Sequence, residues 1–238
     1  ESLRQKIDRE HQLPVDEAVR IATDMADALG YAHRQGVIHR DIKPDNVLML
    51  EGKPVISDFG IALAVGAAGG GRLTETGLSL GTPHYMSPEQ ATGDQTVVRS
   101  TDIYALGAVL YEMLLGEPPY TGSTAQAVLG RIIAGELASA TKERASVPAN
   151  VDAVIRKSLE KLPADRFRSA EDFANALADP GFRHGEVEVT PAAGRRPSWQ
   201  TAAVGVLLGA AGVAVWSGVG QEALPAGPVR FTIKPPDG

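Results

Sequence analysis

The sequence predicts a mainly helical α+β domain with short β-hairpins around one polar loop, followed by a linker and a single transmembrane helix. Residues 14–35 repeat apolar side chains at helical spacing, and residues 101–115 are apolar on nearly every side. Residues 202–220 are almost wholly apolar. We therefore divide the chain into a folded domain (1–180), a linker (181–200), a transmembrane helix (201–220) and the start of another region (221–238).

The predicted helices follow from apolar periodicity and end signals. The first, over residues 14–35, begins beside Pro14 and ends at Gly36. The helix of residues 101–115 has no polar face, which is typical of a helix buried within a domain. Further helices are expected over residues 124–134, 151–159 and 170–178, the last capped by Ser169.

Three short apolar runs between the first two helices predict small strands, at residues 37–38, 47–50 and 55–57. Glu51 and Gly52 form the expected turn between the last two runs. A glycine-rich tract follows at residues 67–71, and no apolar period reappears until about residue 102. This interval predicts a long functional loop.

Composition excludes some classes of function. The chain has 23 Lys and Arg against 29 Asp and Glu, a net charge of -6, so it lacks the basic footprint of a nucleic-acid-binding protein. It has no cysteine, which excludes a disulfide framework and a thiolate metal site. Residues 1–10 are charged and lack the apolar core of a secretory signal, so we expect the chain to start inside a domain.

The apolar stretch of residues 202–220 would extend roughly 28 Å as a helix, close to the hydrocarbon thickness of a bilayer. Arg183, Arg195 and Arg196 precede it, which predicts a cytoplasmic N-terminal side and a single-pass protein of the cell membrane. The alternative interpretation is a buried, glycine-rich core helix.

Two glycines in this stretch, Gly205 and Gly209, form a small-xxx-small pair that is typical of packed membrane helices. A homodimer through the membrane helix is therefore one possible assembly.

Two motifs carry the chemistry. Asp58-Phe59-Gly60 begins twelve residues after the end of His39-Arg40-Asp41-Ile42-Lys43-Pro44-Asp45-Asn46. In order and in setting they resemble the catalytic loop and the metal-binding loop of the protein kinases. The resemblance continues through Gly81-Thr82-Pro83-His84-Tyr85-Met86-Ser87-Pro88-Glu89, Asp102 and Arg166, and covers about residues 1–180.

The resemblance implies transfer of the ATP γ-phosphoryl group to Ser and Thr hydroxyls of proteins, the chain itself included, with Mg²⁺ as cofactor. Asp41 would orient the incoming hydroxyl, and Lys43 would contact the transferred phosphate. Asn46 and Asp58 supply the hard oxygen ligands that Mg²⁺ prefers. Leu48 would form the floor under the adenine.

Other residues of the motifs have structural roles by the same resemblance. His39, Phe59 and Gly60 would pack inside the domain, and Thr82, like Lys43, is typical of the Ser/Thr class. Glu89 would form a buried ion pair with Arg166. Asp102 would accept hydrogen bonds from the backbone of the catalytic loop.

Arg40, next to Asp41, predicts activation by phosphorylation, because an arginine here can pair with a phosphate on the following segment. The candidate sites are Thr74 and Thr76, with Ser79 as a third. The alternative is that these are ordinary solvated loop hydroxyls.

The sequence departs from the family in one respect. Complete kinases carry a glycine-rich phosphate loop, a strand lysine and a helix glutamate before these motifs. This sequence has none of them, so we expect only the larger, C-terminal lobe, inactive by itself. With its membrane helix the chain resembles bacterial receptor-type kinases, and residues 228–238 would begin an extracytoplasmic β domain or form a disordered tail.

Two other functions compete with a membrane-anchored kinase. One is a catalytically dead scaffold, or pseudokinase, that binds partners through the helical lobe. Dead relatives usually lose one of the four residues Asp41, Lys43, Asn46 and Asp58, which are all present here. The other is a small-molecule phosphotransferase, which the complete segment of residues 81–89 disfavours.

Overall fold

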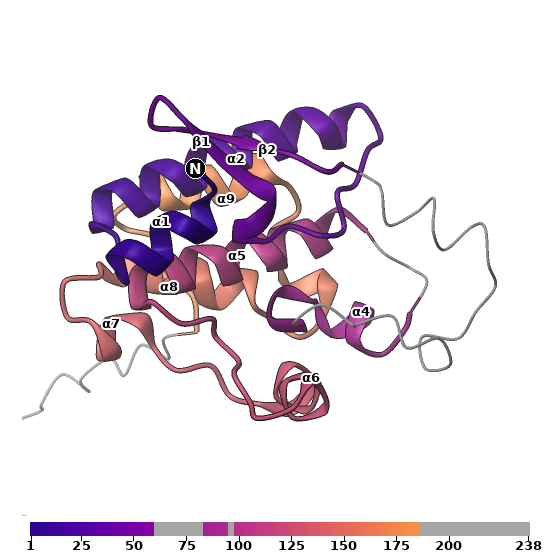
Figure 1. The fold of residues 1–238 in the computed structure, drawn as a ribbon. Helices are drawn as coiled ribbons and strands as arrows, with labels where there is room; N and C mark the ends of the chain where they lie inside the picture. Colours follow the sequence, from indigo (N-terminus) through magenta and orange to yellow (C-terminus); the bar gives the residue numbers. More distant parts are fainter. Residues whose placement is uncertain (60–82, 95–97, 186–238) are drawn as a thin grey trace, which may run out of the picture. The chain divides into compact units, whose positions relative to one another are not determined.

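The computed structural model describes residues 1–59, 83–94 and 98–185, all within the first of two compact units, Glu1–Glu186 and Val187–Gly238. This part is mostly helical with one two-stranded sheet, as predicted (Figure 1). Its elements are α1 (Leu3–Glu10), α2 (Val15–Arg34), η1 (Pro44–Asn46), β1 (Val47–Leu50), β2 (Lys53–Ile56), η2 (Pro83–Tyr85), α4 (Pro88–Ala91), α5 (Arg99–Leu115), α6 (Ala125–Ala134), α7 (Ala140–Glu143), α8 (Ala149–Ser158), η3 (Pro163–Asp165) and α9 (Ala170–Ala178).

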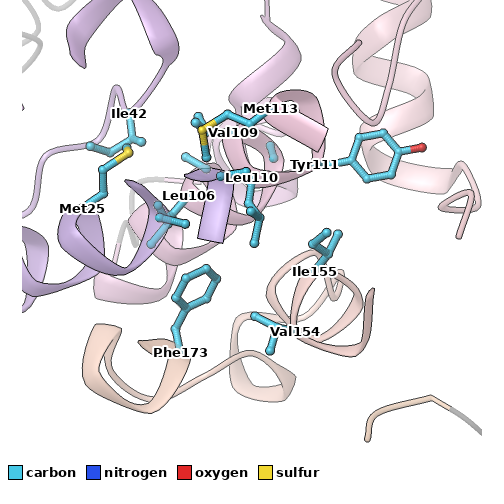
Figure 2. Packing of buried hydrophobic residues seen from close by; sticks show 14 of the residues in the cluster. Met25, Ile42, Leu106, Val109, Leu110, Tyr111, Met113, Val154, Ile155 and Phe173 are labelled. Atoms are coloured by element: carbon cyan, nitrogen blue, oxygen red, sulfur yellow. The ribbon is translucent and has the colours of Figure 1, made fainter. Parts of the chain in front are cut away.

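Helix α5 forms the centre of the core. It packs against α2 and α8, and α2 packs in turn against α9. Figure 2 shows Leu106 and Leu110 of α5 in one cluster with Val154 of α8 and Phe173 of α9. Since α5 is buried on all sides, residues in its first turn hold fixed positions inside the domain.

The contact between α5 and α8 depends on a glycine. A Cβ atom at Gly107 would lie 2.5 Å from the Cβ of Ser158, much closer than two carbon atoms can approach. Ser158 is fully buried and donates its hydroxyl to the carbonyl of Val154, so it cannot swing away. Gly107 therefore sets the spacing of the two helices.

Replacing Gly107 by Ala is expected to lower the free energy of unfolding by about 1–3 kcal/mol, because the added methyl group overpacks the helix contact. Urea denaturation measures this. Gly130→Ala is the matched control, since a Cβ there meets nothing within 4 Å and α6 should gain helix propensity. Equal stability of Gly107→Ala and the parent chain would contradict the assigned packing.

The hairpin of β1 and β2 carries the residues that follow the loop of residues 39–46. Glu51 and Gly52 have φ angles of 51° and 77°, the left-handed pair that a two-residue hairpin turn requires. Val47 pairs with Ile56 and both are buried. On the opposite face, Leu48 is 41% exposed.

One predicted strand is wrong. Residues 37–38 form no strand, because the backbone here serves other partners. The N–H of Val37 closes the end of α2 by donating to the carbonyl of Ala32. Two residues further on, the backbone N–H groups of His39 and Arg40 donate to the carboxylate of Asp102 in α5. The third predicted strand, residues 55–57, is found as Lys53–Ile56.

Helix α1 was not predicted, although its signal is in the sequence. Ser2 and Gln5 form a capping box, and Leu3 and Ile7, four residues apart, are buried on one face.

Within residues 1–59, 83–94 and 98–185, no helix has the length and apolar character needed to cross a membrane. The predicted membrane helix of residues 201–220 and the region of residues 221–238 lie outside the described residues, as does the linker beyond residue 185.

Candidate active site

The loop that begins at His39 is anchored to the core by one carboxylate. Asp102, in the first turn of α5, is 1% exposed. It accepts hydrogen bonds from the backbone N–H of His39 (2.8 Å) and of Arg40 (2.7 Å), and its Oδ2 lies 2.8 Å from Nε2 of His33. Three donors satisfy this buried carboxylate, so the loop has a fixed position on α5.

His39 is held by both of its ring nitrogens. Nε2 donates to the carbonyl of Ser57 at 2.8 Å, and Nδ1 accepts the backbone N–H of Asp41 at 3.2 Å. The ring of Phe59 meets the imidazole edge-on, with centroids 4.7 Å apart. Phe59 is nevertheless 38% exposed, so its predicted packing inside the domain is not found among the described residues. The imidazole is buried and fully engaged, which makes it a structural part of the loop.

Asp41 projects from the loop with its side chain 51% exposed. Its Oδ2 accepts hydrogen bonds from Nζ of Lys43 at 2.7 Å and from Nδ2 of Asn46 at 3.1 Å. Nδ2 of Asn46 also donates to the backbone carbonyl of Asp41 at 2.8 Å. The amide of Asn46 is thus oriented by its nitrogen, and its oxygen accepts no hydrogen bond from the described residues.

Ser57 joins this loop to Asp58. Its N–H and Oγ donate to the carbonyl of Asn46 at 2.8 and 3.1 Å, and Oγ also lies 3.4 Å from Oδ2 of Asp58. Asp58 has a φ of 62° and Arg40 a φ of 72°, a strained conformation for residues other than glycine. In both motifs the backbone keeps an unfavourable conformation, which sets the direction in which the side chains of Arg40 and Asp58 point.

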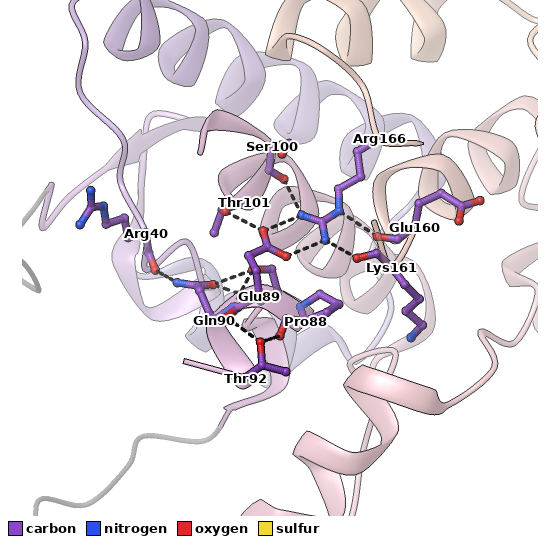
Figure 3. Close-up of polar contacts among 11 residues, drawn as sticks. Arg40, Pro88, Glu89, Gln90, Thr92, Ser100, Thr101, Glu160, Lys161 and Arg166 are labelled. Atoms are coloured by element: carbon purple, nitrogen blue, oxygen red, sulfur yellow. Dashed lines mark hydrogen bonds and ion pairs between the residues drawn. The ribbon is translucent and has the colours of Figure 1, made fainter. Parts of the chain in front are cut away.

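A second segment, residues 83–94, contacts the loop through Gln90. Its Nε2 donates to the carbonyl of Arg40 at 2.8 Å (Figure 3). Ser87 and Gln90 form a capping box that begins α4, so the side chain of Gln90 is fixed at both ends. Nε of Arg40 is buried and has no partner among the described residues.

A cleft of about 1010 Å³ lies between the loop and this segment. Asp41 and Lys43 line one side, and Tyr85 and Gln90 line another. Arg4 and Glu112 also line the cleft, and sequence reasoning singled out neither residue. The cleft brings the functional groups of the first motif beside the segment of residues 83–94.

Glu89 of α4 and Arg166 form a buried, two-pronged ion pair with both N–O distances at 2.8 Å (Figure 3). Thr101 adds a hydrogen bond to Oε1 of Glu89 at 2.7 Å. Burial opposes ionisation of this carboxyl, but the hydrogen bonds from Arg166, the backbone and Thr101 outweigh it and lower the pKa of Glu89 to about 2. The pair ties the segment of residues 83–94 to the end of η3, where Arg166 lies.

The lowered pKa of Glu89 makes stability depend on pH. Since the folded pKa lies below the ordinary value of 4.5, the contribution is complete above about pH 4.5 and is lost as the pH falls towards 2. The shift corresponds to about 3 kcal/mol. Urea midpoints between pH 6 and pH 2.5 should therefore fall more steeply for the parent chain than for Glu89→Gln; parallel curves would contradict the pair's role.

Comparison with known proteins settles the family. The family model of the protein kinase domain matches residues 1–178, three quarters of the chain. The chain belongs to the protein kinase family. This confirms the resemblance that the motifs at His39 and Asp58 predicted.

Curated kinases of mycobacteria are similar in sequence. The serine/threonine-protein kinase PknB of Mycobacterium tuberculosis is 38% identical over 172 residues, which are 72% of this chain and 27% of that protein. PknB of Mycolicibacterium smegmatis is 40% identical over 156 residues, 65% of this chain and 25% of that protein. PknH of Mycobacterium bovis is 40% identical over 172 residues, which are 70% of this chain and 28% of that protein. The chain thus spans about a quarter of the length of these relatives.

Protein kinases use ATP and Mg²⁺, and the donors at this site fit them. Within the part of the chain that the structure describes, no three His, Cys, Asp or Glu side chains group to hold a metal. Mg²⁺ in a phosphoryl-transfer site needs fewer, because it keeps waters and phosphates as ligands. The carboxylate of Asp58 and the amide oxygen of Asn46 are hard donors of the required kind.

Some predicted residues are not described. Gly60 and Thr82 lie outside the described residues, as do the candidate phosphorylation sites Thr74, Thr76 and Ser79. Conversely, sequence reasoning gave no role to Ser57, although it bridges Asn46 and Asp58. A hydroxyl one residue before an acidic metal-ligand candidate was the available signal.

Proposed function

We propose that residues 1–180 are the larger, C-terminal part of a Ser/Thr protein kinase domain that transfers the γ-phosphoryl group of ATP to protein hydroxyls. The observation that carries this proposal is the arrangement of Asp41. Its carboxylate is half-exposed in the cleft, and one of its oxygens accepts hydrogen bonds from both Lys43 and Asn46. Such a carboxylate is positioned to receive the hydroxyl of a peptide.

The residues would act as follows. Asp41 accepts the substrate hydroxyl proton while the hydroxyl oxygen bonds to the γ-phosphorus and the bond from that phosphorus to the ADP oxygen breaks. Lys43 turns from Asp41 to the transferred phosphoryl group. Asn46 and Asp58 would hold Mg²⁺, which would neutralise phosphate charge. Leu48, exposed on the hairpin, would form the floor under the adenine.

The test is transfer of phosphate from labelled ATP by the full-length protein, to itself and to a generic basic protein, with Mg²⁺ and with EDTA. We expect phosphoserine and phosphothreonine only, and no transfer with EDTA. The chain of residues 1–238 alone should be inactive, because its sequence lacks a glycine-rich phosphate loop. Absence of transfer by the full-length protein would favour a scaffold that binds partners.

We infer that Arg40 receives a phosphate on Thr74 or Thr76. Its Nε is buried without a partner among the described residues, and its backbone is fixed by Asp102 and Gln90. A phosphate could therefore pair with a guanidinium whose Nε has no hydrogen-bond partner in the part of the chain that the structure describes. Phosphatase treatment should lower the rate of transfer, and Thr76→Ala with Thr74→Ala should remove that sensitivity.

We also propose that residues 201–220 span the cell membrane, with the kinase domain in the cytoplasm. The uncharged apolar stretch and the preceding arginines support this. The protein should stay in the membrane pellet after alkaline washing, and deletion of residues 201–220 should release it.

A homodimer through Gly205 and Gly209 is tested by cross-linking two copies of the protein in the membrane. Cross-linking that is lost in Gly205→Ile would support a homodimer, and unchanged cross-linking would exclude this contact.

A further inference from the structure

The wall of the cleft contains a closed polar cluster to which the proposed chemistry assigns no part. It consists of Arg4 from α1, Tyr85 from η2 and Glu112 from α5. Nη1 and Nη2 of Arg4 donate to the two carboxylate oxygens of Glu112 at 2.9 and 3.2 Å. The hydroxyl of Tyr85 accepts from Arg4 and donates to Glu112.

Glu112 is paired at both of its oxygens by these partners. Its side chain is 3% exposed, and both of its oxygens accept hydrogen bonds from groups of the chain itself. Burial and the charge of Glu112 raise the pKa of Tyr85, so the hydroxyl keeps its proton and remains a donor. Both oxygens of this carboxylate are therefore paired without a donor from a substrate.

The corner is nevertheless acidic. Asp45 also lines the cleft, with a side chain 56% exposed and its Oδ2 3.9 Å from Nε of Arg4. We call Asp45, Tyr85 and Glu112 the acidic corner. Arg4 is the cation that lies between its two carboxylates, and its own side chain is only 25% exposed.

A buried carboxylate without a cation is strongly destabilised. If Arg4 did not fill the acidic corner, a basic side chain of a bound peptide could enter it and supply the missing cation. The charge-assisted bonds of such a side chain would then add to the affinity for that peptide.

We propose that Arg4 is a specificity-determining residue, an internal cation that fills the acidic corner so that the cleft does not select substrates with a basic residue there. This inference rests on the proposed kinase function and names a property of the same cleft. Removing the guanidinium converts the corner into a subsite for an arginine or lysine of the substrate.

The experiment uses the full-length protein and a panel of Ser-containing peptides that differ only in the position of one arginine. For each peptide, kcat/KM is divided by that of the all-Ala peptide. The parent protein should give ratios within about threefold at every position. In Arg4→Met, the kcat/KM ratio for arginine at one position should rise about tenfold or more, as expected for a desolvated charge-assisted hydrogen bond.

Two variants test the assignment. Arg9→Met is the matched control, because Arg9 lies in the same helix, pairs with Glu1 and Glu10, and does not line the cleft. Its profile should equal that of the parent. Adding Glu112→Gln to Arg4→Met should remove the new preference, since the receiving carboxylate is gone.

A merely structural role has a different signature. Arg4→Met would then lower kcat/KM equally for all peptides, with a lower melting temperature and unchanged ratios, and the proposal would be overturned. A tenfold preference for arginine already present in the parent would overturn it too. If Arg4→Met fails to fold, Arg4→Lys, which keeps a charge but loses the two-pronged pair, should show a smaller rise at the same position.

Failure of the kinase function is distinguishable from failure of this inference. If the parent protein transfers no phosphate to any peptide, the proposed function fails. Peptide affinities measured by fluorescence anisotropy on the same panel then decide the role of Arg4. A higher affinity of Arg4→Met for peptides with arginine at one position supports the proposed role of Arg4. Relative peptide affinities equal to those of the parent refute that role.

Discussion

Replacing Asp41 by Asn is expected to lower the rate of phosphate transfer by the full-length protein by about 10²–10⁴-fold. The amide oxygen of Asn can still accept the hydrogen bonds of Lys43 and Asn46, so the loop keeps its shape. The variant loses the charge and the basicity that draw the proton from the substrate hydroxyl. The initial rate of transfer from labelled ATP measures the effect.

Asp24→Asn is the matched control for this substitution. Asp24 lies on α2 with its side chain 41% exposed and only a 3.8 Å contact with Arg20. Its transfer rate and its urea midpoint should equal those of the parent. A fully active Asp41→Asn would mean that the half-exposed carboxylate in the cleft is not the proton acceptor.

Replacing Arg166 by Met is expected to lower the free energy of unfolding by about 3–5 kcal/mol, because it leaves the carboxylate of Glu89 buried without its cation. Arg166 also donates to the backbone carbonyls of Glu160, Lys161 and Ser100, and it stacks on the ring of Tyr104 at 4.9 Å. Methionine keeps much of the side-chain volume, so the loss measured by urea denaturation is mainly electrostatic.

Arg168→Met serves as the control, since this arginine is exposed two residues away and should change stability by less than about 0.5 kcal/mol. The double variant Glu89→Gln with Arg166→Met should be more stable than the sum of the two single losses predicts. Additive losses would show that the two side chains do not depend on each other.

Local sequence signals predicted most of the helices. The apolar period of α2 and the uniform apolar character of α5 gave their positions to within two residues. Ser169 caps α9 as expected, because its side-chain oxygen accepts the N–H of Asp172, three residues along the chain. This cap does not depend on any tertiary contact. Such features depend on neighbours in sequence, which is why pattern reasoning recovers them.

Features that depend on distant partners were harder to predict. Residues 37–38 have strand-forming side chains. However, the N–H of Val37 donates to the carbonyl of Ala32 at the end of α2, and the N–H of His39 donates to Asp102. Arg4, Tyr85 and Glu112 meet only in the folded chain, 81 and 108 positions apart from Arg4. Charged residues at such separations give no periodic signal, so the acidic corner could not be read from the sequence.

The anchoring of the catalytic loop by Asp102 has a consequence for hydrogen exchange. Amide protons in surface loops usually exchange with solvent through small local openings. Those of His39 and Arg40 are bonded instead to a carboxylate in the first turn of the most buried helix. They should exchange about as slowly as the amides of α5 itself, so that the residue beside Asp41 opens only when the core of the domain does.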